Sequence, residues 1–81
     1  LDTVSLLDLW QWDEATFLAK TEGSPLRRTG YQSFMRNVAI GLGNAPFSEQ
    51  IIAALKSKRD LHDEIVQVHI DWAIQEQHLK P

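Results

Sequence analysis

The sequence contains no cysteine, and this absence excludes several kinds of site. A chain without thiols forms no disulfide, has no thiolate nucleophile and offers no cysteine ligand to zinc or to an iron–sulfur cluster. No apolar run is long enough to cross a bilayer, and no segment alternates apolar and polar residues as a half-buried strand does. With 81 residues, 43% of them hydrophobic and 23% charged, the composition is typical of one small folded domain.

Helical periodicity and capping residues are found in the N-terminal part of the chain. Asp2 or Thr3 is suited to cap a first short helix, and Asp13 is a typical N-cap for a second. Gly23 supplies the left-handed conformation that ends such a helix. The sequence begins at Leu1 without an apolar signal segment, which we interpret as a cut from a longer protein.

A new start signal is followed by a short turn, which Thr29-Gly30 is predicted to interrupt, and then by a third helix. Ser24 followed by Pro25 suits a helix N-terminus, because the serine caps it and the proline presets the backbone. From Tyr31 onward, apolar residues recur at helical spacing until Gly43 and Asn44, where the helix is predicted to end. The apolar face consists of Phe34, Met35, Val38 and Leu42.

Two more helices are predicted in the C-terminal half. Ser48 is a typical N-cap for the fourth helix, which ends in the basic residues 56–59. Asp60 is predicted to cap the fifth helix, whose apolar stripe consists of Leu61, Ile65, Val68 and Trp72. We therefore predict a single all-α domain over residues 1–81, with about five short helices packed as a HEAT-like helical-repeat array or a small irregular bundle.

The sequence shows no arrangement typical of catalysis or metal binding. His62 and His69 are seven residues apart on the predicted last helix, about 10 Å along its axis, too far to chelate one ion. We interpret these histidines and His78 as structural or surface residues. Carboxylates cluster where helices begin, which capping explains, and no serine has the context of a nucleophile. We predict no catalytic residue and no metal site in this chain.

Positive charge is concentrated in the middle of the sequence. Residues 15–59 carry seven Lys and Arg against two Asp and Glu, although the net charge of the whole chain is -3. Arginines that bind phosphates would produce such a block, and so would solvated charges that pair with the acidic ends; the pattern leaves both interpretations open. The candidate binding residues are Lys20, Arg27, Arg28, Arg36, Lys56, Lys58 and Arg59.

A small polar stripe accompanies the apolar face of the third helix. Asn37, Gly41 and Asn44 lie at spacings of four and seven, and a neighbouring backbone could approach closely there. Direct contact with a ligand is the alternative interpretation. The residues predicted to shape the surface are Ser24, Pro25, Asn37, Gly43 and Asn44.

The same segments resemble a known enzyme family. The resemblance rests on Gly23-Ser24-Pro25-Leu26-Arg27-Arg28, on Met35-Arg36-Asn37-Val38-Ala39-Ile40-Gly41-Leu42-Gly43-Asn44 and on His69-Ile70-Asp71-Trp72-Ala73. In this order and at about this spacing, over roughly residues 5 to 75, the sequence resembles the C-terminal part of bacterial epoxyqueuosine reductase.

The resemblance implies a cytoplasmic parent enzyme that reduces epoxyqueuosine to queuosine in tRNA with cobalamin and two 4Fe-4S clusters. Those cofactors would be bound upstream, and none in this chain. The matching part would be a non-catalytic, HEAT-like C-terminal domain that helps bind tRNA and packs on the cobalamin and ferredoxin-like domains. Arg27, Arg28 and Arg36 would contact RNA phosphates or the cofactor domain. No membrane contact is expected, and the protein is predicted to be a monomer.

The alternative is a free-standing helical-repeat module for protein interaction. It predicts an exposed apolar groove and no response to nucleic acid. Cysteine-rich ferredoxin-like motifs upstream in the gene would favour the reductase, and their absence would exclude it.

Overall fold

The computed structural model describes residues 2–81, and all regular secondary structure in this range is helical. Its α-helices are α1 (Thr3–Trp10), α2 (Glu14–Lys20), α3 (Tyr31–Asn44), α4 (Glu49–Lys58) and α5 (Glu64–His78). Two short 3-10 helices, η1 (Pro25–Thr29) and η2 (Arg59–Leu61), join α2 to α3 and α4 to α5. This confirms the prediction of an all-α chain with about five short helices.

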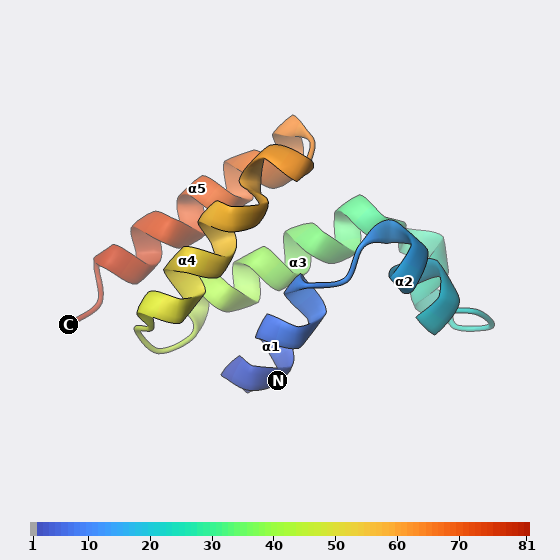
Figure 1. The fold of residues 1–81 in the computed structure, drawn as a ribbon, viewed down its shortest axis with the longest axis horizontal. Helices are drawn as coiled ribbons and strands as arrows, with labels where there is room; N and C mark the ends of the chain where they lie inside the picture. The colour runs from blue at the N-terminus through green and yellow to red at the C-terminus, as the bar shows by residue number, and fades with distance from the viewer. Residues whose placement is uncertain (1) are drawn as a thin grey trace.

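The helices form an elongated body of 41 × 26 × 17 Å, in which α3 and α5 share the largest interface. Figure 1 shows α4 and α5 as an antiparallel hairpin that turns at η2, with α1 against α3. The α2 helix and η1 lie beyond the N-terminal end of α3. The α4–α5 hairpin follows α3 along its length, because His62 at its turn packs on Tyr31 and Ala73 lies against Gly43.

Three of the predicted N-caps are present. Asp2 and Asp13 each accept a hydrogen bond at 2.8 Å from the backbone N–H three residues on, and Ser48 does so at 3.3 Å. These hydrogen bonds lower the pKa of the two aspartates, because they favour the ionised carboxylate. The first, second and fourth helices therefore begin where the sequence predicted.

The predicted cap of the last helix is wrong by three residues. The N-cap of α5 is Asp63, whose carboxylate accepts the Val66 N–H at 3.0 Å. Asp60 instead lies in η2, where the chain tightens after α4 and the His62 N–H bonds to the Arg59 carbonyl at 3.3 Å. The sequence carries acidic residues at both positions, so composition alone did not separate the turn from the helix start.

The segment after α2 is a short 3-10 helix, which ends at Thr29 and Gly30 where the sequence predicted an interruption. Ser24 caps it, with its Oγ accepting the Leu26 N–H at 3.2 Å, and Pro25 is its first residue, as predicted. Gly23 and Gly30 flank it with φ of 76° and 84°, a left-handed region that favours glycine. Gly23 is left-handed as predicted, but α2 already ends at Lys20 with Thr21 as its C-cap, so the glycine lies in the turn that follows the helix.

One apolar core joins α1, α3, α4 and α5. The predicted apolar face of α3 supplies three of its buried side chains, Met35, Val38 and Leu42. Trp10 of α1 is fully buried in the core, and its indole N–H donates to the Ala54 carbonyl at 2.9 Å. The partners from the last two helices are Ile51, Leu55, Val66, Ile70 and Ala73.

The apolar stripe predicted for the last helix does not face this core. Leu61, Ile65 and Val68 are 74%, 62% and 64% exposed, and Trp72 is 38% exposed. The buried residues of α5 are instead Val66, Ile70, Ala73 and Gln77. This helix has two faces with apolar residues, and the face turned to the core is the one that includes an alanine and a glutamine.

Candidate functional site

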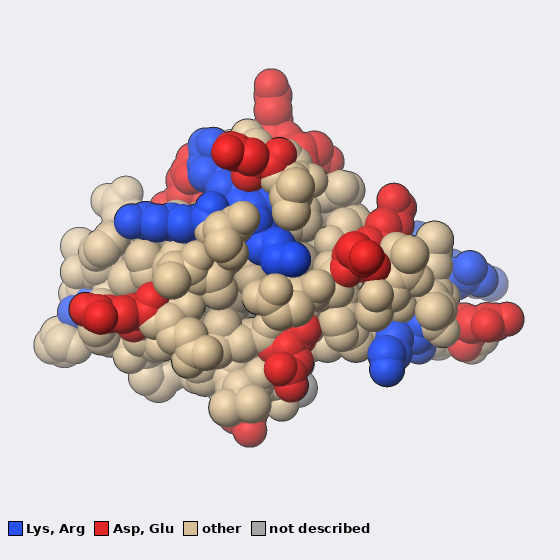
Figure 2. Space-filling model, in the orientation of Figure 1, with Lys and Arg blue, Asp and Glu red and all other residues tan. Residues whose placement is uncertain are grey.

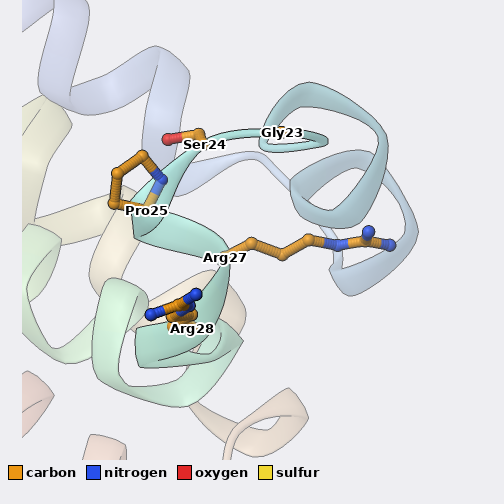
Figure 3. A pocket seen from close by; sticks show the side chains of 5 residues that line it. All are labelled: Gly23, Ser24, Pro25, Arg27 and Arg28. Atoms are coloured by element: carbon orange, nitrogen blue, oxygen red, sulfur yellow. The ribbon is translucent and has the colours of Figure 1, made fainter.

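Arg27 and Arg28 line a shallow hollow at the η1 end of the molecule. The other residues around it are Gly23, Ser24 and Pro25, so five of the residues singled out in the sequence lie together. Figure 3 shows the two arginine side chains leaving η1 in different directions, because successive residues of a 3-10 helix are about 120° apart. Both side chains are exposed. The pair therefore presents two separate guanidinium groups, each able to bind a phosphate oxygen.

Lys20 and Arg36 come from the two elements that flank η1. Lys20 is the exposed last residue of α2, and Arg36 lies half-buried in the second turn of α3. Both α2 and η1 pack on α3. These two residues belong to the same end of the molecule as Arg27 and Arg28.

The other candidate cations, Lys56, Lys58 and Arg59, belong to α4 and η2. Figure 2 shows Lys and Arg atoms in two separate groups on the visible face, one over α4 and one at the end formed by α2 and η1. Acidic side chains lie between the two groups. On this face, the basic block of the sequence is therefore divided in the fold.

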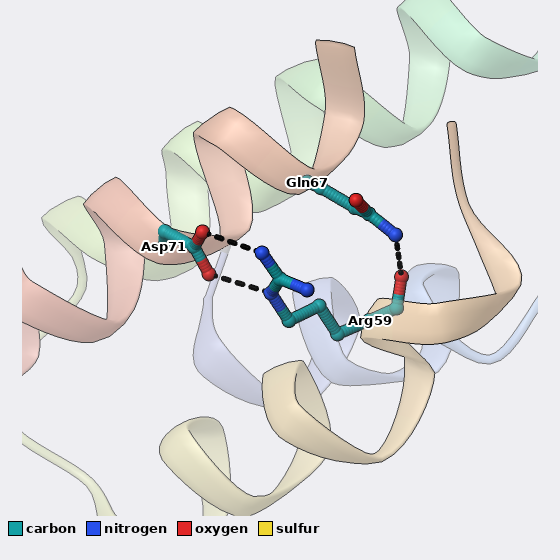
Figure 4. Close-up of polar contacts among 3 residues, drawn as sticks. All are labelled: Arg59, Gln67 and Asp71. Carbon is teal, nitrogen blue, oxygen red and sulfur yellow. Dashed lines mark hydrogen bonds and ion pairs between the residues drawn. The ribbon is translucent and has the colours of Figure 1, made fainter. Parts of the chain in front are cut away.

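Arg59 makes an ion pair within the chain. Its Nε and Nη2 each donate to one carboxylate oxygen of Asp71 at 2.8 Å, and its carbonyl accepts the Gln67 side-chain amide at 3.1 Å (Figure 4). The pairing lowers the pKa of Asp71 and raises that of Arg59. Sequence reasoning grouped Arg59 with the RNA or interface candidates, but its guanidinium joins η2 to α5.

Lys58 lies beside acidic residues. It lines a hollow with Asp13, Glu14 and His62, and its charge contributes to the lowered pKa of Asp13 after the larger effect of the capping hydrogen bonds. Lys56 is exposed and lines a different hollow, beside Glu49 and other residues of α4. Neither lysine adjoins the hollow at Arg27 and Arg28.

Gly43 marks the closest approach of α3 to α5. A Cβ atom built there would lie 2.7 Å from Cζ3 of Trp72 and 2.9 Å from Cα of Ala73, too close for any side chain. The sequence predicted such an approach on the neighbouring Asn37, Gly41 and Asn44 stripe. At Gly41 the nearest neighbour is instead the Leu6 side chain, and both asparagines are exposed.

Gln77 fixes the turn between α3 and α4, and sequence reasoning missed it. Its side chain is fully buried, and its amide nitrogen donates to the carbonyls of Leu42 and Ala45 at 2.8 and 2.9 Å. Its amide oxygen accepts the Ser48 N–H at 2.9 Å. The Lys80 ammonium adds a hydrogen bond to the carbonyl of Gly43. The available signal was spacing, since Gln77 lies four and seven residues after buried positions of α5.

His62 is the one histidine that the fold buries. Its ring packs against Trp10 and Tyr31, with centroids 5.2 and 6.0 Å apart, and neither ring nitrogen has a hydrogen-bond partner within residues 2–81. Burial lowers the pKa of His62, with a smaller opposing effect from Asp63 and a small lowering by Lys58. A structural role, as predicted, fits this placement. His69 is half-buried, with its Nδ1 against the Ile65 carbonyl at 2.8 Å.

Neither a metal-binding cluster nor a membrane-spanning helix is found within residues 2–81. No group of three or more His, Asp or Glu side chains there comes together in a way that could hold a metal ion. None of the helices in this range has the length and hydropathy to cross a membrane. The cofactors implied by the resemblance include iron–sulfur clusters, and a chain without cysteine supplies no thiolate to ligate them.

The chain is similar in sequence to several curated proteins. It is 51% identical over 74 residues to the epoxyqueuosine reductase of Xanthomonas campestris, which covers 91% of this chain and 21% of that protein. The enzyme of the same name from Pseudomonas aeruginosa is 49% identical over 74 residues, covering 91% of this chain and 20% of its own length. The chain is homologous to a part of epoxyqueuosine reductase.

The extent of the match defines what this homology covers. Against the Aliivibrio fischeri epoxyqueuosine reductase, identity is 48% over 79 residues, which is 98% of this chain and 21% of the relative. The chain thus spans about a fifth of the length of the curated relatives it matches. No family model and no solved structure matches it. The homology confirms the resemblance seen in the sequence.

Proposed function

We propose that this chain is a non-catalytic C-terminal domain of an epoxyqueuosine reductase, which helps bind tRNA and packs on the cofactor-bearing part of the enzyme. The main support is the homology over nearly the whole chain to a fifth of such reductases. In this proposal the enzyme reduces epoxyqueuosine to queuosine in the cytoplasm, as a monomer. Cobalamin and two 4Fe-4S clusters belong to the remaining four fifths or so of the polypeptide.

The tRNA contact is assigned to the η1 end of the domain. Arg27 and Arg28 are exposed in an open hollow, and Arg36 and Lys20 come from the helices beside it. Guanidinium groups at such a surface suit the phosphates of an RNA backbone, which are read by charge and shape. Ser24 and Pro25 set the direction of η1. Gly43 sets the position of α3 against α5. Asn37 and Asn44 shape the exposed surface of α3.

A HEAT-like arrangement is part of the same proposal. The antiparallel pairing of α4 with α5, and the packing of both α1 and α5 on α3, supports stacked helical pairs over residues 2–81. Such an array leaves its outer helix faces available to neighbouring domains.

Binding of tRNA by the full-length reductase tests the contact. Replacing Arg27, Arg28 and Arg36 together by alanine is expected to weaken binding and to reduce the slope of log K against log salt by about two. The slope falls because fewer counterions are released on binding when fewer phosphates are contacted. A matched Arg→Lys triple variant keeps the charge and should keep most of the slope. Unchanged affinity together with unchanged salt dependence in the alanine variant would contradict the RNA contact.

The second candidate is a free-standing helical-repeat module for protein interaction. The exposed apolar residues of α5 favour it, because large apolar side chains on a surface often mark a partner site. The gene's upstream sequence distinguishes the two. Cysteine-rich ferredoxin-like motifs in the same reading frame support the reductase, and a reading frame without them supports the module.

A further inference from the structure

The outer face of α5 carries a row of exposed apolar side chains with no partner in the described fold. Ile65, Val68 and Trp72 lie at spacings of three and four, so they form one stripe along the helix. Val68 and Trp72 also line a hollow with His69 and with Ile40 of α3. We call Ile40, Ile65, Val68 and Trp72 the outer face of α5.

Trp72 is supported on one side by α3. Its ring lies against Gly43, where a Cβ atom would stand only 2.7 Å from Cζ3, so the backbone of α3 supports the indole from behind. Trp72 as a whole is 38% exposed. A partly exposed tryptophan that packs on a neighbouring helix beside a hollow is the kind of residue that anchors a protein interface, because the contact with α3 reduces the conformational freedom left to lose on binding.

The charges of α5 indicate what kind of surface it would contact. The helix contains Glu64, Asp71 and Glu76 and has no lysine or arginine, and the Arg59 guanidinium that reaches it from η2 is paired with Asp71. Nucleic acid and anionic lipid surfaces are both bound through basic side chains, so this helix is unsuited to either. An apolar protein surface is the chemistry that matches it.

We infer that the outer face of α5 docks onto the upstream, cofactor-bearing part of the same reductase polypeptide. This inference rests on the proposed function, in which about four fifths of the enzyme's length lies outside the matched region. A covalently linked partner of that size is present at high effective concentration, so an apolar face of a few side chains suffices for intramolecular docking. In this arrangement the arginines of the η1 end contact RNA, and α5 contacts the rest of the protein.

Hydroxyl-radical footprinting with mass spectrometry tests the docking directly. Oxidation of Val68 and Trp72 is expected to be at least about fivefold slower in the full-length reductase than in the 81-residue chain. Trp10, which is fully buried, should be slow in both and serves as the internal reference. Equal oxidation of Trp72 in the two proteins would overturn the inference.

Two further outcomes would assign the face to another occupant and also overturn the inference. Protection of Trp72 that disappears on dilution would indicate a second copy of the chain. Protection that requires added tRNA would indicate RNA. The measurement is independent of the arginine variants, so a failed docking result leaves the tRNA proposal standing, and the reverse also holds.

A pair of variants separates docking from folding. Val68→Lys should leave the melting temperature of the 81-residue chain nearly unchanged, since Val68 is 64% exposed there. In the full-length reductase it should raise the oxidation of Trp72 to the level of the isolated chain. Gln50→Lys places the same charge on an exposed position of α4 and should change neither protein. If Val68→Lys leaves Trp72 protected in the full-length reductase, the face is not the docking surface.

Discussion

Gly43 of α3 and Trp72 of α5 touch with no space between them for a side chain. A methyl group on Gly43 would stand 2.7 Å from Cζ3 of the indole, with the Ala73 backbone only 2.9 Å away. The glycine therefore sets the distance between the two helices that share the largest interface of the fold. A tight backbone contact of this kind cannot be relieved by rotating one side chain, because Ala73 presents its Cα.

Replacing Gly43 with alanine is expected to lower the free energy of unfolding. Overpacking of a close helix contact costs about 1–3 kcal/mol, more than the roughly 1 kcal/mol that alanine gains over glycine in helix propensity. Gly41→Ala is the matched control, because its Cβ would meet only the flexible tip of Leu6 at 3.1 Å. Urea unfolding measures both variants. A Gly43→Ala protein as stable as Gly41→Ala would show that the helices separate without cost.

Gln77→Met should destabilise the turn between α3 and α4. The methionine keeps much of the side-chain volume but leaves the part-buried Ser48 N–H and the buried carbonyls of Leu42 and Ala45 without their partner. We expect a loss of at least about 3 kcal/mol, because three groups lose their partner and each unpaired buried group costs about 1–3 kcal/mol. Gln75→Met on the exposed side of the same helix should have little effect. Faster hydrogen exchange at the Ser48 amide would locate the damage, and an unchanged rate would contradict it.

His62 should make stability depend on pH below about 6.5. Its pKa is lowered in the folded chain from the usual 6.5, chiefly by burial, so the unfolded chain binds the proton first as pH falls. Stability from the neutral ring is complete above pH 6.5 and decreases as pH falls toward the folded pKa. His62→Phe should remove this slope in thermal unfolding, whereas His78→Phe at an exposed position should retain it. Equal slopes in both variants would exclude the effect.

The pair of Arg59 and Asp71 should contribute in a different pH range. The arginine lowers the pKa of Asp71, so the stabilisation is present above the ordinary value of 3.8 and is lost as pH falls through the folded pKa. Asp71→Asn should therefore lower the melting temperature slightly at neutral pH and not at pH 2, and high salt should reduce the difference. Asp60→Asn is the control. If Asp71→Asn still lowers the melting temperature at pH 2, Asp71 stabilises the fold by something other than the ion pair.

The helix boundaries could be predicted from sequence to the extent that local interactions set them. Asp2, Asp13 and Ser48 cap helices through hydrogen bonds to amides three residues away, which a sequence pattern captures. Asp63 was missed because Asp60 offers the same chemistry, and only the path of the chain through η2 decides between them.

The orientation of the last helix could not be predicted in the same way. Its most regular apolar stripe includes Val68 and Trp72, but the fold turns Ala73 and Gln77 inward because α3 approaches closely at Gly43. Gln77 is a polar residue, so its sequence favours an exposed position. The hydrogen-bond partners that allow its amide to be buried come together only in the folded chain.

The parts of the candidate site that depend on neighbouring residues could be predicted from the sequence, and the parts that depend on helix packing could not. Arg27 and Arg28 are neighbours of Pro25 along the chain, so their shared hollow follows from local structure. Arg59 is paired with a residue 12 positions away, and Lys58 lies beside Asp13, which no local pattern reveals. A basic block in sequence was therefore divided by helix packing.

The hydrogen bonds of Gln77 also bear on the order in which the chain can fold. The carbonyl of Leu42 receives its buried partner from a residue 35 positions later, so during synthesis the end of α3 stays uncapped until nearly all of α5 has been made. Contacts of this sequence separation raise the entropic cost of ordering the chain and slow folding. The turn between α3 and α4 is therefore completed late, and a ribosome-bound nascent chain halted before Gln77 would hold helices that lack their final closure.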